Sequence, residues 1–153
     1  MTAITAIREL RPDERSWANE CYRSIRFAES PPSARAIVAE RDGERIGLGR
    51  LVELEPGVVE LGGIWTAERA RGLGVARAVV SALIERAGSV QLWCIPFAHL
   101  VAFYASFGFD AAGAPWPASV ADKVAAVESD TALPEVAVLV RSPARLHASH
   151  AVP

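Results

Sequence analysis

The segment from Arg69 to Gly74 combines two arginines with two glycines. It lies between a predicted strand, Val58 to Thr66, and a predicted helix from about Gly72 to Ala87. The start of a helix presents unpartnered backbone N–H groups and the positive end of the helix dipole. Glycines at that point let a ligand approach the backbone without meeting a Cβ atom. The turn is therefore predicted to bind an anionic, phosphate-bearing cofactor.

Spacing excludes two common phosphate-binding motifs. A P-loop requires G-x-x-x-x-G-K-[ST], and no Lys followed by Ser or Thr lies near this turn. A dinucleotide-binding fingerprint requires G-x-G-x-x-G, but Arg77 stands where its third glycine belongs. The spacing that remains is R-x-x-G-x-G, which runs from Arg69 to Gly74.

This spacing resembles the acyl-CoA signature of the GNAT superfamily of N-acetyltransferases. A second segment, Phe103-Tyr104-Ala105-Ser106-Phe107-Gly108-Phe109, is similar to the family's F/L-Y-x-x-x-G-F segment and follows a predicted strand, Ser89 to Cys94. Together the motifs cover roughly Val58 to Phe109. The resemblance implies a single α/β (α+β) domain over residues 1–141 with the GNAT acyl-CoA N-acyltransferase fold. That fold has a mixed, splayed sheet of six or seven strands flanked by helices.

The resemblance also implies acetyl-CoA (coenzyme A) as the donor. Gly72 and Gly74 would hold its pyrophosphate with the backbone of the turn, while Arg69 and Arg71 add positive charge at the edge. The backbone of the preceding strand would pair with the pantetheine arm. The cofactor-binding residues implied are Ile64, Trp65, Thr66, Arg69, Ala70, Arg71, Gly72, Leu73, Gly74, Val75, Ala76 and Tyr104.

Two catalytic roles follow from the same resemblance. Tyr104 matches the tyrosine that protonates the departing CoA thiolate, and a phenol with a pKa near roughly 10 is protonated at neutral pH. The family often takes its general base from a glutamate on the motif's strand, where this chain has Gly62. Glu60 lies two residues earlier, on the same face of a regular strand, and is our candidate base. Glu53, His99 or an ordered water are the alternatives.

Other residues near the motifs bear on the site. Gly62-Gly63 in the middle of a strand predicts a bulge that splays the strand, where a pantetheine arm could insert. Phe97 replaces the asparagine with which many family members bind the pantetheine. Trp65, Trp93 and Trp116 could line an acceptor pocket, although tryptophans more commonly pack in the core.

The resemblance leaves the acceptor open. An amine of a small molecule or peptide is expected, and the segment Trp17 to Pro32 forms the usual acceptor wall. The missing glutamate at Gly62 and the missing asparagine at Phe97 also allow a non-catalytic acyl-CoA-binding or regulatory module. A structural subunit of a homodimer is a third possibility.

The elements that position these residues follow from local patterns. Asp42-Gly43 and Glu55-Pro56-Gly57 are turn signals that predict a meander of antiparallel strands in the first half. Val75, Val79 and Leu83 recur at helical spacing and predict a helix packed on the sheet. The remaining expected strands are Ile4 to Arg8, Arg35 to Arg41, Glu44 to Leu54 and Glu135 to Val140, and the remaining helices are Arg11 to Arg26, Pro96 to Phe107 and Ala118 to Val127.

Composition limits the class of protein. With 51% apolar and 22% charged residues, the 153-residue chain is typical of one globular domain. Sixteen basic and 18 acidic residues provide no basic field for nucleic acid. Cys21 and Cys94 lack the spacing of a zinc site or a disulfide scaffold, so we expect no metal. The N-terminus resembles no signal peptide and no apolar run spans a membrane, which favours a cytoplasmic protein with a mobile tail over residues 142–153.

Overall fold

The computed structural model describes residues 4–143, which divide into two compact units. The first unit comprises the chain up to Val52 together with Leu61–Gly88. The second comprises Glu53–Glu60 together with the chain from Ser89 onward. The third strand (Glu44–Glu55) and the fourth strand (Val58–Thr66) each contribute residues to both units.

Seven strands form a mixed sheet in the order β1-β2-β3-β4-β5-β7-β6. β2 pairs antiparallel with β1 and β3, whereas β4 and β5 pair in parallel. This mixed sheet with flanking helices confirms the α/β (α+β) class predicted from the sequence. Among the described residues, no helix has the length and apolar character needed to cross a membrane. The elements are β1 (Ala6–Glu9), η1 (Pro12–Glu14), α1 (Arg15–Ser24), β2 (Arg35–Arg41), β3 (Glu44–Glu55), β4 (Val58–Thr66), η2 (Glu68–Ala70), α2 (Val75–Ala87), β5 (Leu92–Cys94), η3 (Ala98–Leu100), α3 (Val101–Ala105), β6 (Asp110–Ala111), α4 (Ala118–Glu128) and β7 (Leu139–Arg141).

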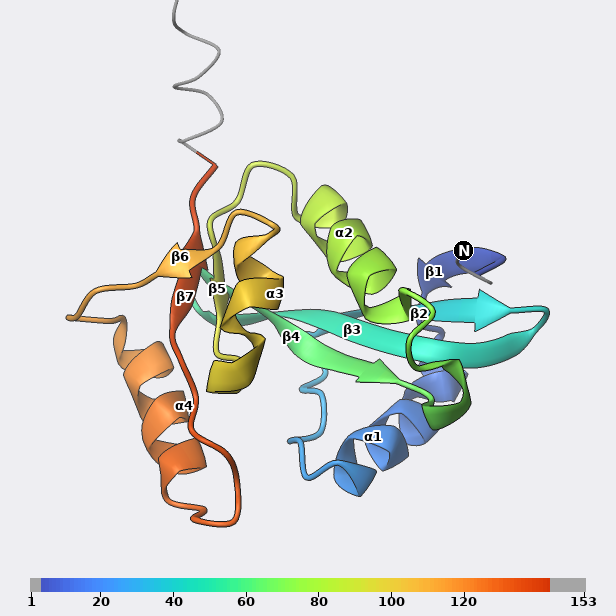
Figure 1. Ribbon diagram of the computed structural model, residues 1–153, viewed down its shortest axis with the longest axis horizontal. Coiled ribbons are helices and arrows are strands. Elements are labelled where there is room, and N and C mark those ends of the chain that lie inside the picture. Colours follow the sequence, from blue (N-terminus) through green and yellow to red (C-terminus); the bar gives the residue numbers. More distant parts are fainter. Residues whose placement is uncertain (1–3, 144–153) are drawn as a thin grey trace, which may run out of the picture. The chain divides into compact units, whose positions relative to one another are not determined.

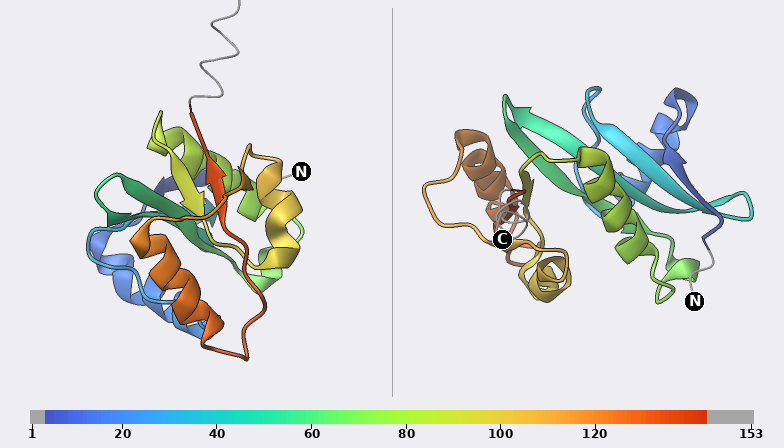
Figure 2. Two further views of the ribbon diagram at one scale, coloured as in Figure 1. Left: turned by 90° about the vertical axis from the view of Figure 1, so that its left-hand side faces the viewer. Right: turned by 90° about the horizontal axis from the view of Figure 1, so that it is seen from above.

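In the first unit, α1 and α2 cover opposite faces of the strands β1 to β4 (Figures 1 and 2). Side chains alternate between the two faces along a strand. Leu48 of β3 and Val38 of β2 pack with Ala18 and Tyr22 of α1 in one buried cluster. The amphipathic first helix is thus held by apolar burial against the middle of the sheet.

α2 packs directly on the backbone of β3 because two glycines of that strand face it. A Cβ atom at Gly47 would lie 2.6 Å from Val75 Cγ1, and one at Gly49 would lie 2.5 Å from Val79 Cγ1. A larger residue at either glycine would push the helix away. Val75, Val79 and Leu83 are all buried, which confirms the stripe predicted from their spacing.

In the second unit, α3 and α4 lie on opposite faces of the strands β5 and β7 (Figure 2). β7 pairs antiparallel with both β5 and β6. The ring of Tyr104 in α3 packs edge to face on Phe109, with centroids 5.9 Å apart. The apolar cluster beneath α4 consists of Val58, Val120, Val124 and Val138.

The helix predicted from about Gly72 begins later, at Val75. Gly72 and Gly74 both have φ +80°, which is incompatible with a right-handed helix. The glycines therefore form the turn before α2 rather than its first residues. This correction places the whole predicted turn ahead of the helix, with Arg69, Arg71, Gly72 and Gly74 exposed.

The helix predicted over Pro96 to Phe107 is also shorter, comprising η3 and α3. The carbonyl of Pro96 accepts a hydrogen bond from the Ala137 N–H at 2.8 Å, and Phe97 forms a bridge with Val136. Pro96 and Phe97 thus pair with another extended segment instead of beginning the helix. The strand predicted over Glu135 to Val140 begins later, as β7 at Leu139, and Val136 forms only the isolated bridge. The predicted tail over residues 142–153 lies, from residue 144 on, outside the described residues.

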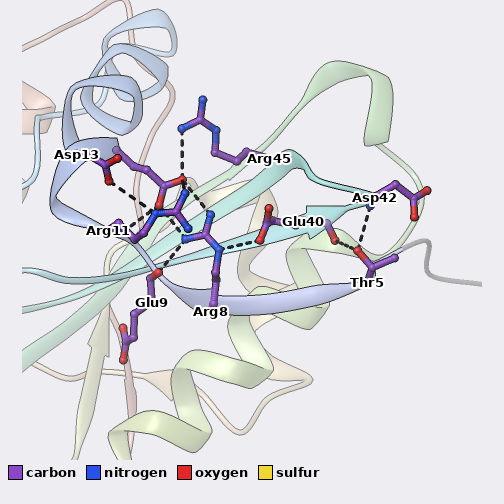
Figure 3. A network of polar contacts seen from close by, with 9 residues as sticks. Thr5, Arg8, Glu9, Arg11, Asp13, Glu40, Asp42 and Arg45 are labelled. Atoms are coloured by element: carbon purple, nitrogen blue, oxygen red, sulfur yellow. Dashed lines mark hydrogen bonds and ion pairs between the residues drawn. The ribbon is translucent and has the colours of Figure 1, made fainter.

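Arg8, Arg11 and Arg45 belong to a network of polar contacts in the first unit (Figure 3). A buried carboxylate, Glu14, accepts hydrogen bonds from all three. Glu14 is 3% exposed, and its two oxygens accept hydrogen bonds from Arg8 Nη1 and Nη2 at 2.8 and 2.9 Å. Arg45 Nη1 lies 3.3 Å from Glu14 Oε2, and the Arg11 backbone N–H donates to Oε1 at 2.9 Å. The hydrogen bonds from Arg8, with that from Arg11, lower the pKa of Glu14 from its ordinary 4.5 to about 2.

The depressed pKa of Glu14 predicts acid sensitivity. Its ionised form stabilises the fold above about pH 4.5, and this contribution is lost as the pH falls from 4.5 towards 2. Glu14→Gln should lower the free energy of unfolding by about 2 kcal/mol at neutral pH and remove this part of the acid slope. Urea unfolding between pH 2 and pH 7 would measure both effects.

The exposed neighbour Asp13 provides the control, because its carboxylate lies 3.6 Å from Arg11 Nε and its side chain is 81% exposed. Asp13→Asn should unfold as the wild type does. Equal acid slopes in the wild type and Glu14→Gln would contradict a stabilising role for the buried ion pair.

Candidate active site

The turn from Arg69 to Gly74 lies in the first unit and leaves the start of α2 accessible. Gly72 and Gly74 are exposed, and a Cβ atom at Gly72 would meet nothing within 4 Å. Gly74 is the N-cap of α2, and no side chain caps that helix. The first N–H groups of the helix therefore have no capping oxygen and can bind an anion.

The two arginines of the turn differ in their partners. Arg69 Nε forms an ion pair with Glu44 Oε2 at 3.0 Å, and both side chains are more than half exposed. The guanidinium of Arg71 is exposed and has no partner among residues 4–143. Arg71 can thus contact an anion directly, whereas Arg69 would first exchange a surface carboxylate for it. An exposed pair of this kind contributes little to stability and is readily exchanged.

The side chains of the other predicted cofactor-binding residues in and after the turn are buried or half-buried. Ala70 and Val75 are buried, and Leu73 and Ala76 are half-buried. Their side chains pack inward, so their backbone, together with Gly72 and Gly74, is the part available to a ligand.

β4 carries the other predicted contacts of the donor. Ile64, Trp65 and Thr66 are half-buried. The indole of Trp65 packs edge to face on Trp17 with centroids 5.7 Å apart. Just before them, Gly63 has φ +60°, which interrupts regular strand geometry where the glycine pair predicts a bulge.

Two residues that the sequence analysis missed hold Gly63 in place. The Tyr22 hydroxyl donates a hydrogen bond to the Gly63 carbonyl at 2.8 Å. The Arg50 guanidinium lies 4.2 Å above the Tyr22 ring, and a Cβ atom at Gly63 would lie 2.7 Å from Arg50 Nε. A sequence signal for Arg50 did exist. Residues i and i+2 of a strand lie on the same face, so Arg50 is a charged residue on the same strand face as the apolar Leu48.

The second unit contains both predicted catalytic residues, Glu60 and Tyr104, and one of them forms an ion pair. Glu60, 6% exposed, forms an ion pair with Lys123 Nζ of α4. Lys123 is the single lysine of the sequence, and 63 residues separate it from Glu60. Sequence reasoning missed this pair because no local pattern connects a strand with a helix so distant along the chain. The predicted base is therefore a buried carboxylate with a cationic partner.

Tyr104 is 5% exposed, and burial, with the nearby Cys94 and Glu60, raises its pKa above the ordinary 10. Its hydroxyl has no hydrogen-bond partner in the described residues, yet it reaches solvent, because Ser119 Oγ is the one sealed side-chain polar atom without a partner there. Burial raises the pKa of the Cys94 thiol as well, with Glu60 adding to the effect. At neutral pH this group therefore holds a protonated phenol and a protonated thiol.

The alternative residues are placed differently. Glu53 and His99 are both exposed, and the His99 ring stacks on Phe97 with centroids 6.1 Å apart. Trp93 and Trp116 pack against the apolar cluster of the second unit, and Trp116 Nε1 donates to the Ala112 carbonyl at 3.0 Å. These contacts explain both tryptophans as packing residues.

Comparison with known proteins identifies the family. Residues 4–109 match the acetyltransferase (GNAT) family, and the chain belongs to it. The match confirms the resemblance drawn from the two motifs and places the chain among the acyl-CoA-dependent N-acyltransferases. No curated protein sequence matches the chain.

Solved structures share the fold at low sequence identity. ElaA of Escherichia coli has a TM-score of 0.66 at 16% identity, with 91% of this chain and 99% of that chain covered. Rv2747 of Mycobacterium tuberculosis, in complex with CoA, has a TM-score of 0.64 at 16% identity, with 90% and 98% covered. N-acetylglutamate synthase of Neisseria gonorrhoeae, complexed with coenzyme A and L-arginine, has a TM-score of 0.68 at 16% identity, with 93% of this chain but 34% of that one covered. These likenesses confirm the predicted GNAT fold.

The open space at Gly72 predicts a selective effect on CoA binding. Gly72→Ala would place a methyl group where a phosphate must approach the backbone, and we expect the dissociation constant for CoA to rise about tenfold or more. Isothermal titration calorimetry with CoA would measure it. Gly43→Ala is the matched control, since Gly43 has φ +83° and equally open surroundings in a hairpin turn.

Both variants should lose about 1 kcal/mol of stability from the strained φ, while only Gly72→Ala loses affinity. Equal affinities in the two variants would exclude the turn from donor binding.

The ion pair between the buried Glu60 and the partly exposed Lys123 predicts coupled effects on stability. Lys123→Met leaves the Glu60 carboxylate without its partner and should lower the free energy of unfolding by about 2 kcal/mol. Adding Glu60→Gln removes the stranded charge and should recover part of that loss. Urea unfolding of both single variants and the double variant gives the coupling energy. Asp122→Asn, an exposed change on the same helix, should have little effect, and additive single effects would contradict the pairing.

Proposed function

We propose that this protein transfers an acetyl group from acetyl-CoA to a primary amine of a small molecule or peptide by direct attack. The observation that carries the proposal is the exposed glycine turn at the uncapped start of α2, in a chain that belongs to the GNAT family. N-acetylglutamate synthase of Neisseria gonorrhoeae, of similar fold, is complexed with coenzyme A and N-acetyl-glutamate. That complex supports a CoA donor and an N-acetylated product for this fold.

The residues of the first unit would bind the donor. Backbone N–H groups at Gly72, Gly74 and the start of α2 would hold the pyrophosphate, with Arg71 adding positive charge and Arg69 exchanging Glu44 for phosphate. The backbone of Ile64–Thr66 would pair with the pantetheine arm. Tight electrostatic binding at the phosphates leaves the thioester end to be positioned by β4.

Tyr104 and Glu60 would move the protons. The neutral amine nitrogen attacks the thioester carbonyl carbon, a C–N bond forms, and the C–S bond breaks. Tyr104 would give its phenolic proton to the departing thiolate, and its raised pKa keeps the phenol protonated at neutral pH. The proton lost by the amine would pass to Glu60, directly or through an ordered water.

A covalent acyl-cysteine intermediate is disfavoured by the state of Cys94. An acyl transfer through cysteine requires a thiolate, whose formation a low thiol pKa promotes. Cys94 is 2% exposed, and burial raises its pKa. Direct attack of the amine on the thioester is therefore the mechanism that we propose.

Replacing the Tyr104 hydroxyl tests the mechanism. Tyr104→Phe should lower kcat about 100-fold with little change in CoA affinity, because the phenol acts only as the thiolate leaves. Thiol release from acetyl-CoA against a panel of amines, with mass spectrometry of the products, measures turnover. In the wild type, the raised pKa of Tyr104 should prevent an alkaline loss of rate between about pH 8 and pH 10 from this group.

Phe103→Leu is the packing control. The ring centroids of Phe103 and Tyr104 are 5.0 Å apart, so this change alters the packing of Tyr104 but leaves its hydroxyl in place. It should retain most of the activity. Binding of acetyl-CoA without turnover of any amine, unaffected by Tyr104→Phe, would identify a non-catalytic acyl-CoA-binding module. Failure to bind acetyl-CoA would exclude both functions.

A further inference from the structure

Arg50 is a buried cation that has no counter-ion among the residues that the structure describes. It is 6% exposed and extends from the part of β3, up to Val52, that belongs to the first unit. Its Nη1 donates to Ser30 Oγ at 2.9 Å, and its guanidinium lies 4.2 Å above the Tyr22 ring. Within residues 4–143 no carboxylate forms an ion pair with it. A neutral hydroxyl and an aromatic face are its only partners there.

The same unit shows how the chain neutralises buried charge elsewhere. Glu14 is buried, and it is paired with Arg8 and Arg45 at 2.8 and 3.3 Å. Burying an ion without a partner costs several kcal/mol, so unpaired buried charges are rare unless a ligand or a catalytic role accounts for them. Arg50 therefore points to an anion supplied from outside the chain.

One edge of the Arg50 guanidinium is available to such an anion. Nε and Nη2 donate to no atom of the described residues, and neither is sealed, because Ser119 Oγ is the one fully buried polar side-chain atom there without a partner. These two nitrogens form the side of the guanidinium fork that matches the two oxygens of a carboxylate. The Ser30 contact at Nη1 holds the opposite side.

Any side chain larger than that of Gly63 would crowd the Nε end of that edge. A Cβ atom at this position would lie 2.7 Å from Arg50 Nε and 2.9 Å from Tyr22 Oη. The Tyr22 hydroxyl is already committed to the Gly63 carbonyl, so it does not compete for the ligand. The edge is thus held in a fixed position with its donors unoccupied, which lowers the entropic cost of binding.

We propose that Arg50 binds a carboxylate of the acceptor, so that the acceptor is an amino acid or another amine that carries a carboxylate. This inference rests on the proposed function. The charged groups of the donor are its phosphates, which belong at the turn from Arg69 to Gly74. Arg50 instead lies beside Gly63, next to Ile64–Thr66, where the uncharged pantetheine arm would run. An anion at that end of the arm belongs to the acceptor.

Matched acceptor pairs test the proposal. Each pair consists of an amino acid and the amine that lacks its carboxylate: L-phenylalanine with 2-phenylethylamine, L-leucine with isoamylamine, and L-histidine with histamine. A dipeptide and its C-terminal amide extend the test to peptides. The wild type should favour the carboxylate member in kcat/KM by about tenfold or more in at least one pair. The ratio is measured within one preparation, so a partly unfolded variant does not distort it.

Arg50→Gln and Arg50→Lys should each bring that ratio close to one, since neither offers the two-pronged fork. Arg35→Gln, an exposed change on the neighbouring strand, should leave the ratio unchanged. A wild type that acetylates amines without regard to the carboxylate would overturn the role of Arg50 and leave the proposed function intact. A preference that survives Arg50→Gln would overturn it equally.

Binding tests the same inference without turnover. In the presence of CoA, N-acetyl-L-phenylalanine should bind the wild type about tenfold or more tightly than N-acetyl-2-phenylethylamine in calorimetry, and the difference should vanish in Arg50→Gln. If no amine is acetylated but this difference is found, the proposed function fails and the carboxylate site stands. Equal binding of the two compounds to the wild type would overturn the site.

Discussion

The hydrogen bond from the Tyr22 hydroxyl to the Gly63 carbonyl is the contact on which the arrangement of the first unit depends. It joins α1 to β4 at the residue where β4 departs from strand geometry with φ +60°. Tyr22 is fully buried, so losing this partner would cost about 1–3 kcal/mol. Because the same ring supports the Arg50 guanidinium, one side chain sets both the course of β4 and the position of a buried charge.

Short-range patterns predicted much of this fold. Asp42-Gly43 has φ +50° and +83°, as a tight hairpin turn requires, and β4 has the predicted bounds. Contacts between distant residues could not be predicted in the same way. The pairing of Glu60 with Lys123 and the approach of Arg50 to Gly63 depend on how strands and helices meet, and a single sequence contains no local signal for either. The prediction that Pro96 begins a helix was wrong for the same reason, because the Pro96 carbonyl accepts a hydrogen bond from a segment about 40 residues away.

The buried charges divide into two kinds by their partners. Glu14 and Glu60 each have a cation within the protein, and their ionisation is bound up with stability. Arg50 has only neutral partners among the described residues, and its charge does not strengthen any ion pair there. A buried charge that forms no ion pair among the described residues, yet is held in place by Tyr22 and Ser30, is better explained by recognition than by stability alone.

The departures from the family pattern need not remove activity, because neighbouring groups can supply the same chemistry. Gly62 has no carboxylate, yet Glu60 lies two residues away along β4 and is buried. Phe97 has no side-chain amide, and its backbone is instead bridged to Val136, so the pantetheine arm would depend on the β4 backbone. The reaction needs a proton donor at the thiolate and an acceptor at the amine, and Tyr104 and Glu60 are chemically able to serve as that pair. The departures at Gly62 and Phe97 are therefore compatible with catalysis. Loss of the Tyr104 hydroxyl would be stronger evidence against it.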